Sequence, residues 1–319
     1  MLLQVKDLDV GFDTPEGEVH AVNKLNFSID SGEALALVGE SGSGKTQTAM
    51  AIMALLAENG HASGEVIYKG NDLLKMTASQ LNNHRGHEIS MIFQDPNTSL
   101  NPFLRIDKQM IEVVVHHQSM QRSEARSKAI EMLRAVRIPD PERAIRMYPH
   151  EFSGGMRQRV MVAMGLLSEP DLLIADEPTA ALDVTVQGQI IHLMNALRQK
   201  SNTAIILITH DLGTVAGLCD RVMVMYAGEA LECGSAEQVF YDPKHPYTKG
   251  LLRSVPRLDQ PDDNELHAIP GNPPNMLSLP EGCKFRDRCP MAYEACVEKP
   301  PMQLDKDRHA WRCFLGEEE

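Results

Sequence analysis

The segment Gly39–Thr46 (Gly-Glu-Ser-Gly-Ser-Gly-Lys-Thr) has the residue types and spacing of a phosphate-binding loop. Its glycines let the backbone curl so that successive N–H groups point at phosphate oxygens. Lys45 can supply a charge to the β and γ phosphates, and Thr46 can offer a hydroxyl to Mg²⁺. A Gly/Ser-rich turn with a surface lysine is the alternative. Because a predicted strand precedes the segment and a predicted helix follows it, we expect a nucleotide phosphate site.

Two acids, Asp176 and Glu177, stand at the end of the apolar run Leu172–Ala175. Asp176 would hold the Mg²⁺ shell, and Glu177 would lie beside the γ phosphate and polarise a water molecule. Two solvated acids at a strand end would be the better interpretation in isolation. Beside a phosphate loop, we interpret them as the metal-binding and water-activating acids.

Two further polar side chains end predicted strands. His210 follows the run Ala204–Thr209, at the carboxyl end where α/β sheets place ligand groups. Gln94 follows the run Ile89–Phe93. The alternatives are a capping or core histidine and an ordinary polar strand end.

Ser153-Gly154-Gly155 opens a predicted helix, and the free N–H groups of that helix make a second anion-binding end. The simple interpretation is a helix cap beside solvated arginines. The other is that this end serves the nucleotide bound by another copy, because one chain then has two phosphate-seeking ends for one nucleotide.

The elements that must position these groups are predicted from apolar patterning. Several runs are continuous in Val, Ile, Leu and Met, which is typical of strands buried on both faces of a helix-covered parallel sheet. The predicted strands are Leu2–Val10, Ala34–Val38, Glu65–Tyr68, Ile89–Phe93, Leu172–Ala175, Ala204–Ile208 and Val222–Tyr226. Helical patterns such as Lys45–Leu56 lie between them, so we expect an α/β fold. Residues from about 96 to 160 have helical spacing and no good strand, which predicts a helical insertion.

Composition and charge exclude some functional classes of protein. The chain has 319 residues, with 31 Lys+Arg against 44 Asp+Glu and a net charge of −13. This balance argues against broad nucleic-acid binding and against adhesion to anionic lipid by charge alone. No apolar run approaches the ~18 residues of a membrane helix, and no signal peptide is visible. We expect the chain to stay in the cytosol.

The chain changes character after about Gly234. Eleven of its 19 prolines lie between Asp242 and Pro301, which predicts turns and irregular chain. Cys219 and Cys233 are interpreted as ordinary buried thiols. Disulfides are disfavoured in the cytosol, whereas clustered thiolates suit zinc or an iron–sulfur cluster. The spacing leaves the metal, and the presence of any metal, open for the four clustered cysteines, Cys283, Cys289, Cys296 and Cys313.

Taken together, the motifs resemble the ATP-binding-cassette (ABC) family. Its motifs occur here in family order: Gly39–Thr46, Gln94, Ser153–Met156, Asp176-Glu177, Ala181–Asp183 and His210. Essentially the whole chain is similar to ATP-binding subunits of bacterial oligopeptide and dipeptide permeases, through the strings Met91–Pro102, Leu173–Thr179, His245–Leu252 and Ile269–Asn275. The common family signature Leu-Ser-Gly-Gly-Gln here has Phe152 and Met156 at its ends, a Met that peptide permeases often carry.

The resemblance implies an ABC ATPase domain over residues 1–234 and a C-terminal extension with a four-cysteine metal site over residues 235–319. The domain would have a RecA-like core, an antiparallel β subdomain and a helical subdomain at about 96–160. The catalytic residues implied are Lys45, Gln94, Glu177 and His210. The ATP-contacting residues implied are Phe12, Gly39, Ser41, Gly42, Ser43, Gly44, Lys45, Thr46, Gln47, Gln94, Ser153, Gly154, Gly155, Asp176 and Asp183. The Mg²⁺ residues implied are Thr46, Gln94 and Asp176.

The resemblance also implies cofactors and partners. ATP and Mg²⁺ are expected, with a [4Fe–4S] cluster, in preference to zinc, on the four clustered cysteines. The partners implied are two transmembrane permease subunits, a second, paralogous ATPase subunit bound head to tail, and an extracytoplasmic peptide-binding protein. The chain would act at the cytoplasmic face of the inner membrane as a peripheral subunit that powers oligopeptide import.

Three alternatives stay open at this point. The chain could serve a dipeptide, nickel or related permease. It could be a soluble ABC ATPase that acts on nucleic acid or ribosomes, although it has no basic stripe and only a single cassette. It could also be a metal-binding or redox-sensing module on an ATPase scaffold, an idea motivated only by the cysteines of the tail.

Overall fold

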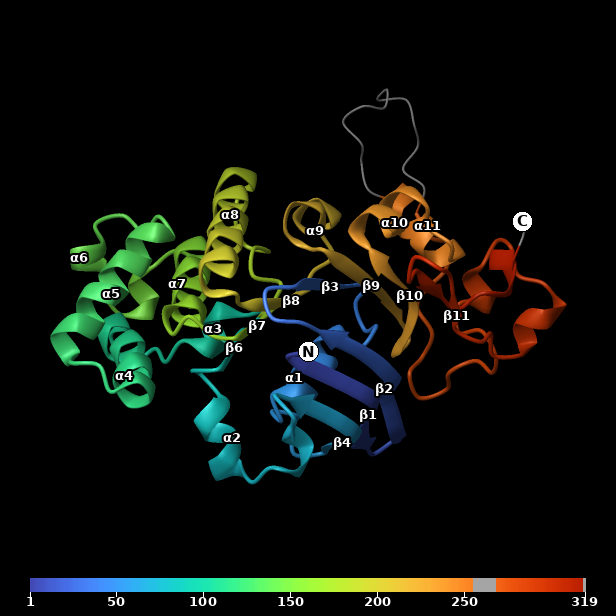
Figure 1. Cartoon of the computed structure of the whole chain (residues 1–319), viewed down its shortest axis with the longest axis horizontal. Helices are drawn as coiled ribbons and strands as arrows, with labels where there is room; N and C mark the ends of the chain where they lie inside the picture. The colour runs from blue at the N-terminus through green and yellow to red at the C-terminus, as the bar shows by residue number, and fades with distance from the viewer. Residues whose placement is uncertain (255–267, 318–319) are drawn as a thin grey trace. The chain divides into compact units, whose positions relative to one another are not determined.

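The structure, a computed structural model, describes residues 1–254 and 268–317 (Figure 1). Residues 255–267, with two of the prolines of the predicted irregular tail, and the last two glutamates lie outside the described residues. Contacts divide the chain into two compact units. The first comprises Met1–Leu2, Ile29–Ala34 and Lys75–Ile208, and the second comprises Leu3–Ser28, Leu35–Leu74 and Thr209–Glu319. The predicted boundary at residue 234 divides the chain into two consecutive domains, whereas each of these units combines separate segments. The domain boundary therefore stays a prediction.

The first unit is organised around three parallel strands in the order β6, β7, β8: Ile89–Ile92, Leu172–Asp176 and Ala204–Ile208. Every side chain of β7 and β8 is buried. A strand covered on both faces must be apolar at each position, which is why these uninterrupted Leu, Ile and Ala runs form it. Helix α7 (Gly154–Leu167) precedes β7, and α8 (Val184–Ser201) joins β7 to β8.

Residues 96–160, all of which the structure describes, contain helices and no strand, so the predicted helical insertion is confirmed. Helix α5 packs against α4 and α7, and its buried side chains repeat at helical spacing: Ala125, Ala129, Met132 and Leu133. The helices before α7 are α2 (Ala78–His84), α3 (Pro96–Ser99), α4 (Ile106–Gln118), α5 (Arg122–Ala135) and α6 (Pro141–Ala144).

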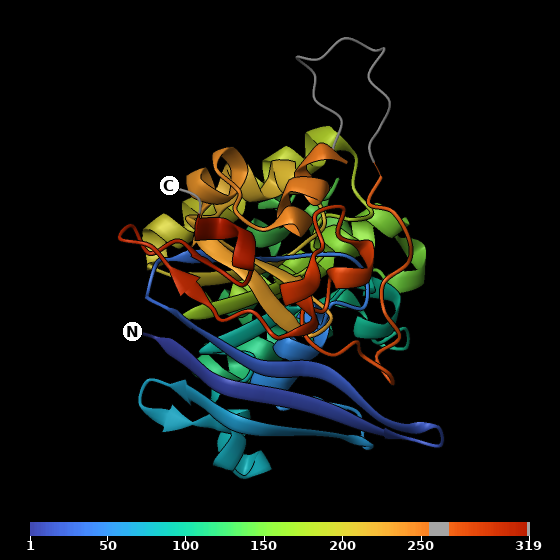
Figure 2. The same cartoon turned by 90° about the vertical axis from the view of Figure 1, so that its right-hand side faces the viewer.

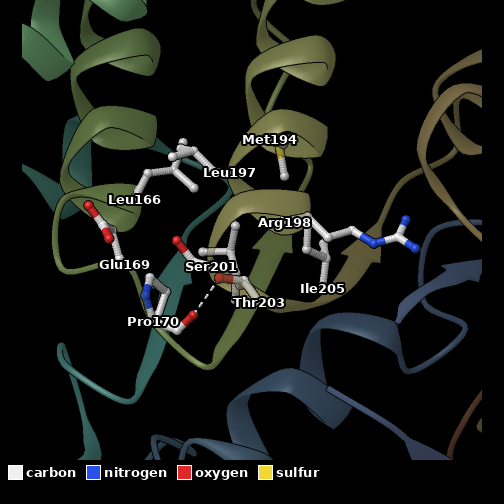
Figure 3. A pocket seen from close by; sticks show the side chains of 10 residues that line it. Leu166, Glu169, Pro170, Met194, Leu197, Arg198, Ser201, Thr203 and Ile205 are labelled. Carbon is white, nitrogen blue, oxygen red and sulfur yellow. Dashed lines mark hydrogen bonds between the residues drawn. The ribbon is translucent and has the colours of Figure 1, made fainter. Parts of the chain in front are cut away.

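A small pocket lies in the first unit and is shown in Figure 3. Leu166, Met194 and Ile205 are among its lining residues, and its volume is about 10 Å³. At its rim, the Thr203 hydroxyl donates a hydrogen bond to the Pro170 oxygen, 2.7 Å away. This volume is roughly that of one water molecule, so the pocket is a packing gap and not a nucleotide site.

The second unit contains an antiparallel sheet in the order β2, β1, β4, β5, and Figure 2 shows its long strands side by side. In β1 the burial of side chains alternates, as expected of a strand with one covered face. The strands are β1 (Leu3–Thr14), β2 (Gly17–Ile29), β4 (Gly60–Tyr68) and β5 (Asn71–Asp72). The predictions found β1 and β4, with shorter bounds, and missed β2.

A second set of strands in this unit leads to the phosphate loop. Strand β3 (Ala34–Val38) pairs in parallel with β9 (Arg221–Tyr226), and β9 pairs antiparallel with β10 (Glu229–Ser235). Beyond β10 lie β12 (Ala310–Trp311) and β11 (Gln303–Leu304), so the C-terminal tail extends this sheet. All seven predicted strands are thereby confirmed, while β2, β5, β10, β11 and β12 were not predicted.

Two expectations about helices in this unit need correction. Helix α1 (Lys45–Ile52) ends four residues before the predicted Leu56, and Ala54 has a left-handed φ of +49°. The tail is less irregular than its prolines suggest, because α10 (Ala236–Tyr241) and α11 (Pro246–Arg253) follow β10. Pro246 occupies the first turn of α11, where the missing N–H costs nothing. Helix α9 (Leu212–Leu218) and three short 3₁₀ turns complete the unit: Arg286–Arg288, Glu294–Val297 and Phe314–Glu317.

Of the helices in the described residues, none has the length and apolar character needed to span a membrane.

Candidate nucleotide-binding site

The phosphate loop connects the end of β3 to the start of α1, as predicted. Gly39 has a φ of +151°, and a Cβ at this position would lie 2.2 Å from the Met225 oxygen on β9. Only glycine therefore fits where the loop leaves the strand. Gly44 is the N-cap of α1, so the loop ends at helix N–H groups that can bind an anion.

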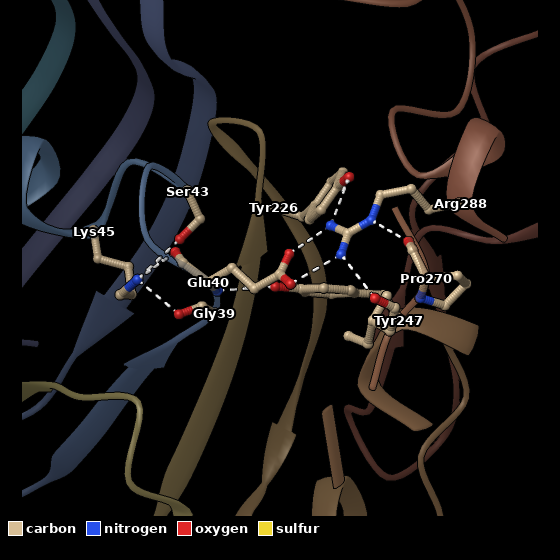
Figure 4. A network of polar contacts seen from close by, with 9 residues as sticks. Gly39, Glu40, Ser43, Lys45, Tyr226, Tyr247, Pro270 and Arg288 are labelled. Atoms are coloured by element: carbon tan, nitrogen blue, oxygen red, sulfur yellow. Dashed lines mark hydrogen bonds and ion pairs between the residues drawn. The ribbon is translucent and has the colours of Figure 1, made fainter. Parts of the chain in front are cut away.

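Lys45 is buried, with 7% of its surface exposed. Its Nζ donates hydrogen bonds to the Gly39 and Glu40 oxygens, each 2.8 Å away, and to Ser43 Oγ at 3.1 Å (Figure 4). The loop thus holds the ammonium group at the helix N-terminus, where positive charge and N–H donors both favour phosphate. Thr46 and Gln47 follow in the first turn of α1 and are half-buried.

Phe12 and His210 lie in the same unit as the loop. Phe12 is inside the long β1 strand rather than just after it, half-buried, and pairs with Gly60 of β4. His210 is exposed and follows Thr209, whose backbone N–H donates to the Leu37 oxygen of β3 at 3.3 Å. The structure therefore brings the His210 segment to the strand that leads into the phosphate loop.

The two acids end β7 in the first unit. Asp176 is the last residue of the strand and is 1% exposed, while Glu177 is half-buried. Glu177 has a left-handed φ of +46°, and its backbone N–H donates to the Ile208 oxygen of β8 at 2.9 Å. A non-glycine residue held in this region carries backbone strain, which is typical of functional positions.

The remaining candidates of the first unit begin helices or follow a strand. The Ser153 side chain caps α7 by accepting from the Met156 N–H at 3.3 Å, and Ser153 and Gly154 are exposed beside the half-buried Gly155. The Asp183 side chain caps α8 by accepting from the Val186 N–H at 3.0 Å. Gln94 is exposed just after β6. Helix N-termini and strand ends of this kind present polar groups to a ligand.

Known proteins match the chain over its whole length. The ABC transporter family model matches residues 22–180, and the model described as oligopeptide/dipeptide transporter, C-terminal region, matches residues 231–296. The oligopeptide transport ATP-binding protein OppD of Salmonella typhimurium is 55% identical over 319 residues, covering 100% of this chain and 95% of OppD. OppD of Escherichia coli K12 is 56% identical over 318 residues, covering 100% and 94%. The chain belongs to the ABC transporter family.

The fold of this ABC ATPase also matches solved structures. A dimeric ATP-binding cassette in a post-hydrolysis state, bound to ADP and phosphate, has a TM-score of 0.68 and 25% identity. The match covers 74% of this chain and 99% of that cassette. The predicted ABC ATPase fold is confirmed, and the chain is an ATP-binding, ATP-hydrolysing subunit of an ABC transporter. The role of each candidate residue stays a prediction.

The four clustered cysteines of the ABC chain are largely shielded from solvent. Cys283, Cys296 and Cys313 are buried, Cys289 is half-buried, and the Cys283 N–H donates to the Cys296 oxygen at 3.1 Å. The pKa of the Cys283 thiol is raised to about 11, mainly by burial and to a lesser extent by the other three cysteines. Cys219 is buried, as expected, and Cys233 is half-buried.

The metal site predicted on these cysteines is not confirmed. Among the described residues, no group of three or more His, Cys, Asp or Glu side chains is arranged so that it could hold a metal ion. Four neighbouring thiols have the right donor chemistry for zinc or an iron–sulfur cluster, but their positions do not form a ligand set.

Sequence reasoning missed two contacts around the ATP motifs. Gln158, 1% exposed on α7, donates hydrogen bonds to the Pro178 oxygen at 2.9 Å and to the Glu177 oxygen at 3.4 Å. In the sequence Gln158 stands between Arg157 and Arg159, so no local pattern marks its amide as buried. The other contact, between Glu40 of the phosphate loop and Arg288 of the tail, leaves no local pattern because 248 positions separate the two residues.

Proposed function

We propose that this ABC ATPase powers the import of oligopeptides across the cytoplasmic membrane as part of a multi-subunit importer. The observation that carries the proposal is the match to two oligopeptide-transport ATPases along the whole chain, at 55% and 56% identity. The match to the oligopeptide/dipeptide C-terminal region over residues 231–296 supports it. A dipeptide permease is the nearest alternative, because that region is shared by both classes.

In this proposal the phosphate loop binds ATP through its N–H groups and the Lys45 ammonium. Thr46, Gln94 and Asp176 would hold Mg²⁺, which when bound neutralises charge on the phosphate oxygens. Glu177 would orient and deprotonate the attacking water, and His210 would contact the γ phosphate. The strained Glu177 backbone and its N–H bond to the Ile208 oxygen hold the residue in a defined backbone conformation at a strand end, which supports a functional role for this acid.

We further propose that the chain works as a head-to-tail pair with a second, paralogous ATPase subunit. The exposed N-terminus of α7 at Ser153–Gly155 would then contact the γ phosphate held by the partner. Asp183 would lie near the boundary between the two subunits. The γ phosphate is then the contact that distinguishes the closed pair from the open pair, so hydrolysis lets the pair separate. The dimeric state of the solved cassette supports this arrangement.

The same proposal includes two transmembrane permease subunits and, through them, an extracytoplasmic peptide-binding protein. The surface around Gln94 and the helical insertion would transmit the motion of the pair to the permease subunits. The chain would be peripheral, at the cytoplasmic face of the inner membrane.

The test is purification of the tagged chain from native membranes in mild detergent, with mass spectrometry of the co-eluting proteins. We expect two permease subunits, a second ATPase and a peptide-binding protein. A co-eluting dipeptide- or nickel-binding protein would reassign the substrate. Recovery only from the soluble fraction, alone or with ribosomal or repair proteins, would contradict the transport proposal and leave the ATPase assignment intact.

We also propose that the four clustered cysteines hold a [4Fe–4S] cluster, with zinc as the alternative. The sequence supports it, because four thiols, the donor type of such clusters, occur within residues 283–313. Metal analysis of anaerobically purified protein should find iron, and Cys289→Ser should lose iron while it keeps ATP binding. Equal iron content in the two proteins would contradict the proposal.

A further inference from the structure

Glu40 of the phosphate loop and Arg288 of the C-terminal tail form a two-pronged ion pair (Figure 4). Arg288 Nη1 donates to Glu40 Oε2 at 2.6 Å, and Nη2 donates to Oε1 at 3.0 Å. The Arg288 side chain is 6% exposed and that of Glu40 is 27% exposed. Bidentate pairs of this geometry are among the strong polar contacts of proteins, and burial reduces their screening by salt.

The same arginine is fixed from the tail side. Its Nε donates to the Pro270 oxygen at 2.8 Å, and Nη1 also donates to the Tyr226 hydroxyl at 3.3 Å. The guanidinium lies 5.7 Å from the centre of the Tyr226 ring and 6.0 Å from that of Phe285. These contacts hold the planar fork in one orientation, which an ammonium group on a flexible stem could not reproduce.

The pair continues directly into the nucleotide-binding groups. The Glu40 backbone oxygen accepts a hydrogen bond from Lys45 Nζ, and the Glu40 N–H donates to the Tyr247 hydroxyl at 2.9 Å. Glu40 is therefore held through its carboxylate by Arg288, through its N–H by Tyr247 and through its oxygen by Lys45. These polar contacts connect the Lys45 ammonium group, which would bind the phosphates, through Glu40 to Arg288, the residue before Cys289.

Glu40 presents an electrostatic problem that Arg288 solves. A carboxylate in a loop that binds a triphosphate repels the ligand, since like charges at short range in a partly buried site interact strongly. Arg288 cancels this charge at the carboxylate itself. Without Arg288, the loop would carry an uncompensated negative charge beside the phosphates.

We propose that Arg288 is a positioning residue of the ATP site: it acts through Glu40, whose negative charge it neutralises beside the phosphates, so that the C-terminal tail completes the site. This inference rests on the ATP-binding part of the proposed function. It gives the tail a role in nucleotide affinity that is separate from metal binding.

Two single substitutions that should change nucleotide affinity differently test the inference. We would measure binding of the non-hydrolysable analogue AMP-PNP, with Mg²⁺, to the full chain by calorimetry. Arg288→Gln should weaken binding about tenfold because it leaves Glu40 unpaired, whereas Glu40→Gln should bind as tightly as the wild type or up to about threefold tighter. The double variant should return to within about threefold of the wild type. Arg288→Lys, which keeps the charge but not the planar fork, should bind with an affinity between those of the wild type and Arg288→Gln.

Arg286→Gln is the matched control, because Arg286 lies in the same 3₁₀ turn and pairs with its exposed neighbour Asp287 at 3.3 Å. It should bind the analogue like the wild type. A purely structural anchor predicts that Glu40→Gln weakens binding as much as Arg288→Gln and that the double variant is no better; either result would overturn the inference. If Arg288→Gln does not fold, the sign of the Glu40→Gln effect decides alone. A wild-type chain that fails to bind the analogue would instead contradict the ATP site.

Discussion

The side-chain amide of Gln158 donates a hydrogen bond to the backbone oxygen of Pro178, 2.9 Å away, and so connects the signature helix α7 to the turn that carries Glu177. A second, longer bond reaches the Glu177 oxygen itself at 3.4 Å. Gln158 is 1% exposed, so these carbonyl groups have no easy replacement by water. The position of Glu177, the proposed general base, therefore depends on the helix whose N-terminus is proposed to contact the partner's nucleotide.

Gln158→Leu should lower the ATPase rate about tenfold or more, because the turn with Glu177 is less firmly held. It should also lower the free energy of unfolding by about 1–3 kcal/mol, since a buried carbonyl loses its donor. The control is Gln118→Leu, because the Gln118 amide donates to the Ser168 oxygen, also at 2.9 Å, and neither residue belongs to the candidate site. The control should lose stability but keep its turnover per folded molecule. Equal turnover in both variants would show that the Gln158 bond is only structural.

Glu177→Gln should bind ATP normally and hydrolyse it roughly 10²–10⁴-fold more slowly, because the amide cannot accept the proton of the attacking water. Single-turnover hydrolysis and equilibrium ATP binding, measured on the same preparation, separate the two effects. Asp171→Asn, which changes the acid at the opposite end of the same strand, should leave both quantities unchanged. Hydrolysis by Glu177→Gln at close to the wild-type rate would assign the base to another residue.

Sequence patterns predicted those strands and helices that are each formed by one continuous stretch of residues with a clear apolar pattern. Strands β7, up to its final Asp176, and β8 are apolar because both faces are covered, and the motif loops follow strand ends. Strand β2 was missed because many of its side chains are exposed and polar, so it has no apolar run. Helix α11 was missed because Pro246 suggested a break, whereas a proline in the first turn begins a helix.

The candidate site also contains residues that local sequence predicts and contacts that it does not predict. Lys45, Asp176 and Ser153 are predictable because their roles follow from local sequence at a helix start or strand end. The contact of Arg288 with Glu40 depends on tertiary packing between distant segments. A single sequence contains no periodic or local signal for such a pair, and only the folded chain shows it.

Two glycines of the phosphate loop should respond very differently to alanine. A Cβ at Gly39 would lie 2.2 Å from the Met225 oxygen, whereas a Cβ at Gly42 (φ +78°) would meet nothing within 4 Å. Gly42→Ala should therefore cost only the backbone strain of about 1–2 kcal/mol, and it is the control for Gly39→Ala. Gly39→Ala should cost clearly more and displace the loop from β9, which thermal unfolding and ATP binding would both detect. Similar losses in the two variants would contradict the close approach at Gly39.

His245 should make the stability of the chain fall in mild acid. It is 1% exposed, and its pKa is lowered to about 4. Burial is the largest cause; the nearby Glu232 carboxylate raises the pKa by a smaller amount, and Lys249 lowers it. In the unfolded chain it binds a proton near the ordinary pKa of about 6.5. The unfolded state therefore binds more protons between these two values, so the stabilisation is complete above pH 6.5 and is lost as the pH falls toward 4. From pH 7 to pH 5 the loss from this group should be about 2 kcal/mol.

Equilibrium urea unfolding across pH 5–7 checks this expectation. The His245 Nδ1 accepts a hydrogen bond from the Tyr247 N–H at 3.0 Å and caps α11, and the Asn side chain of His245→Asn can also accept this bond without titrating. The variant should be less stable at pH 7, because its smaller side chain leaves space beside Phe285, but its stability should fall less steeply toward pH 5. The exposed His20 provides the control, His20→Asn, which should keep the wild-type slope. If the free energy of unfolding falls equally steeply with pH in His245→Asn and in the wild type, His245 is not the group responsible for the loss of stability in acid.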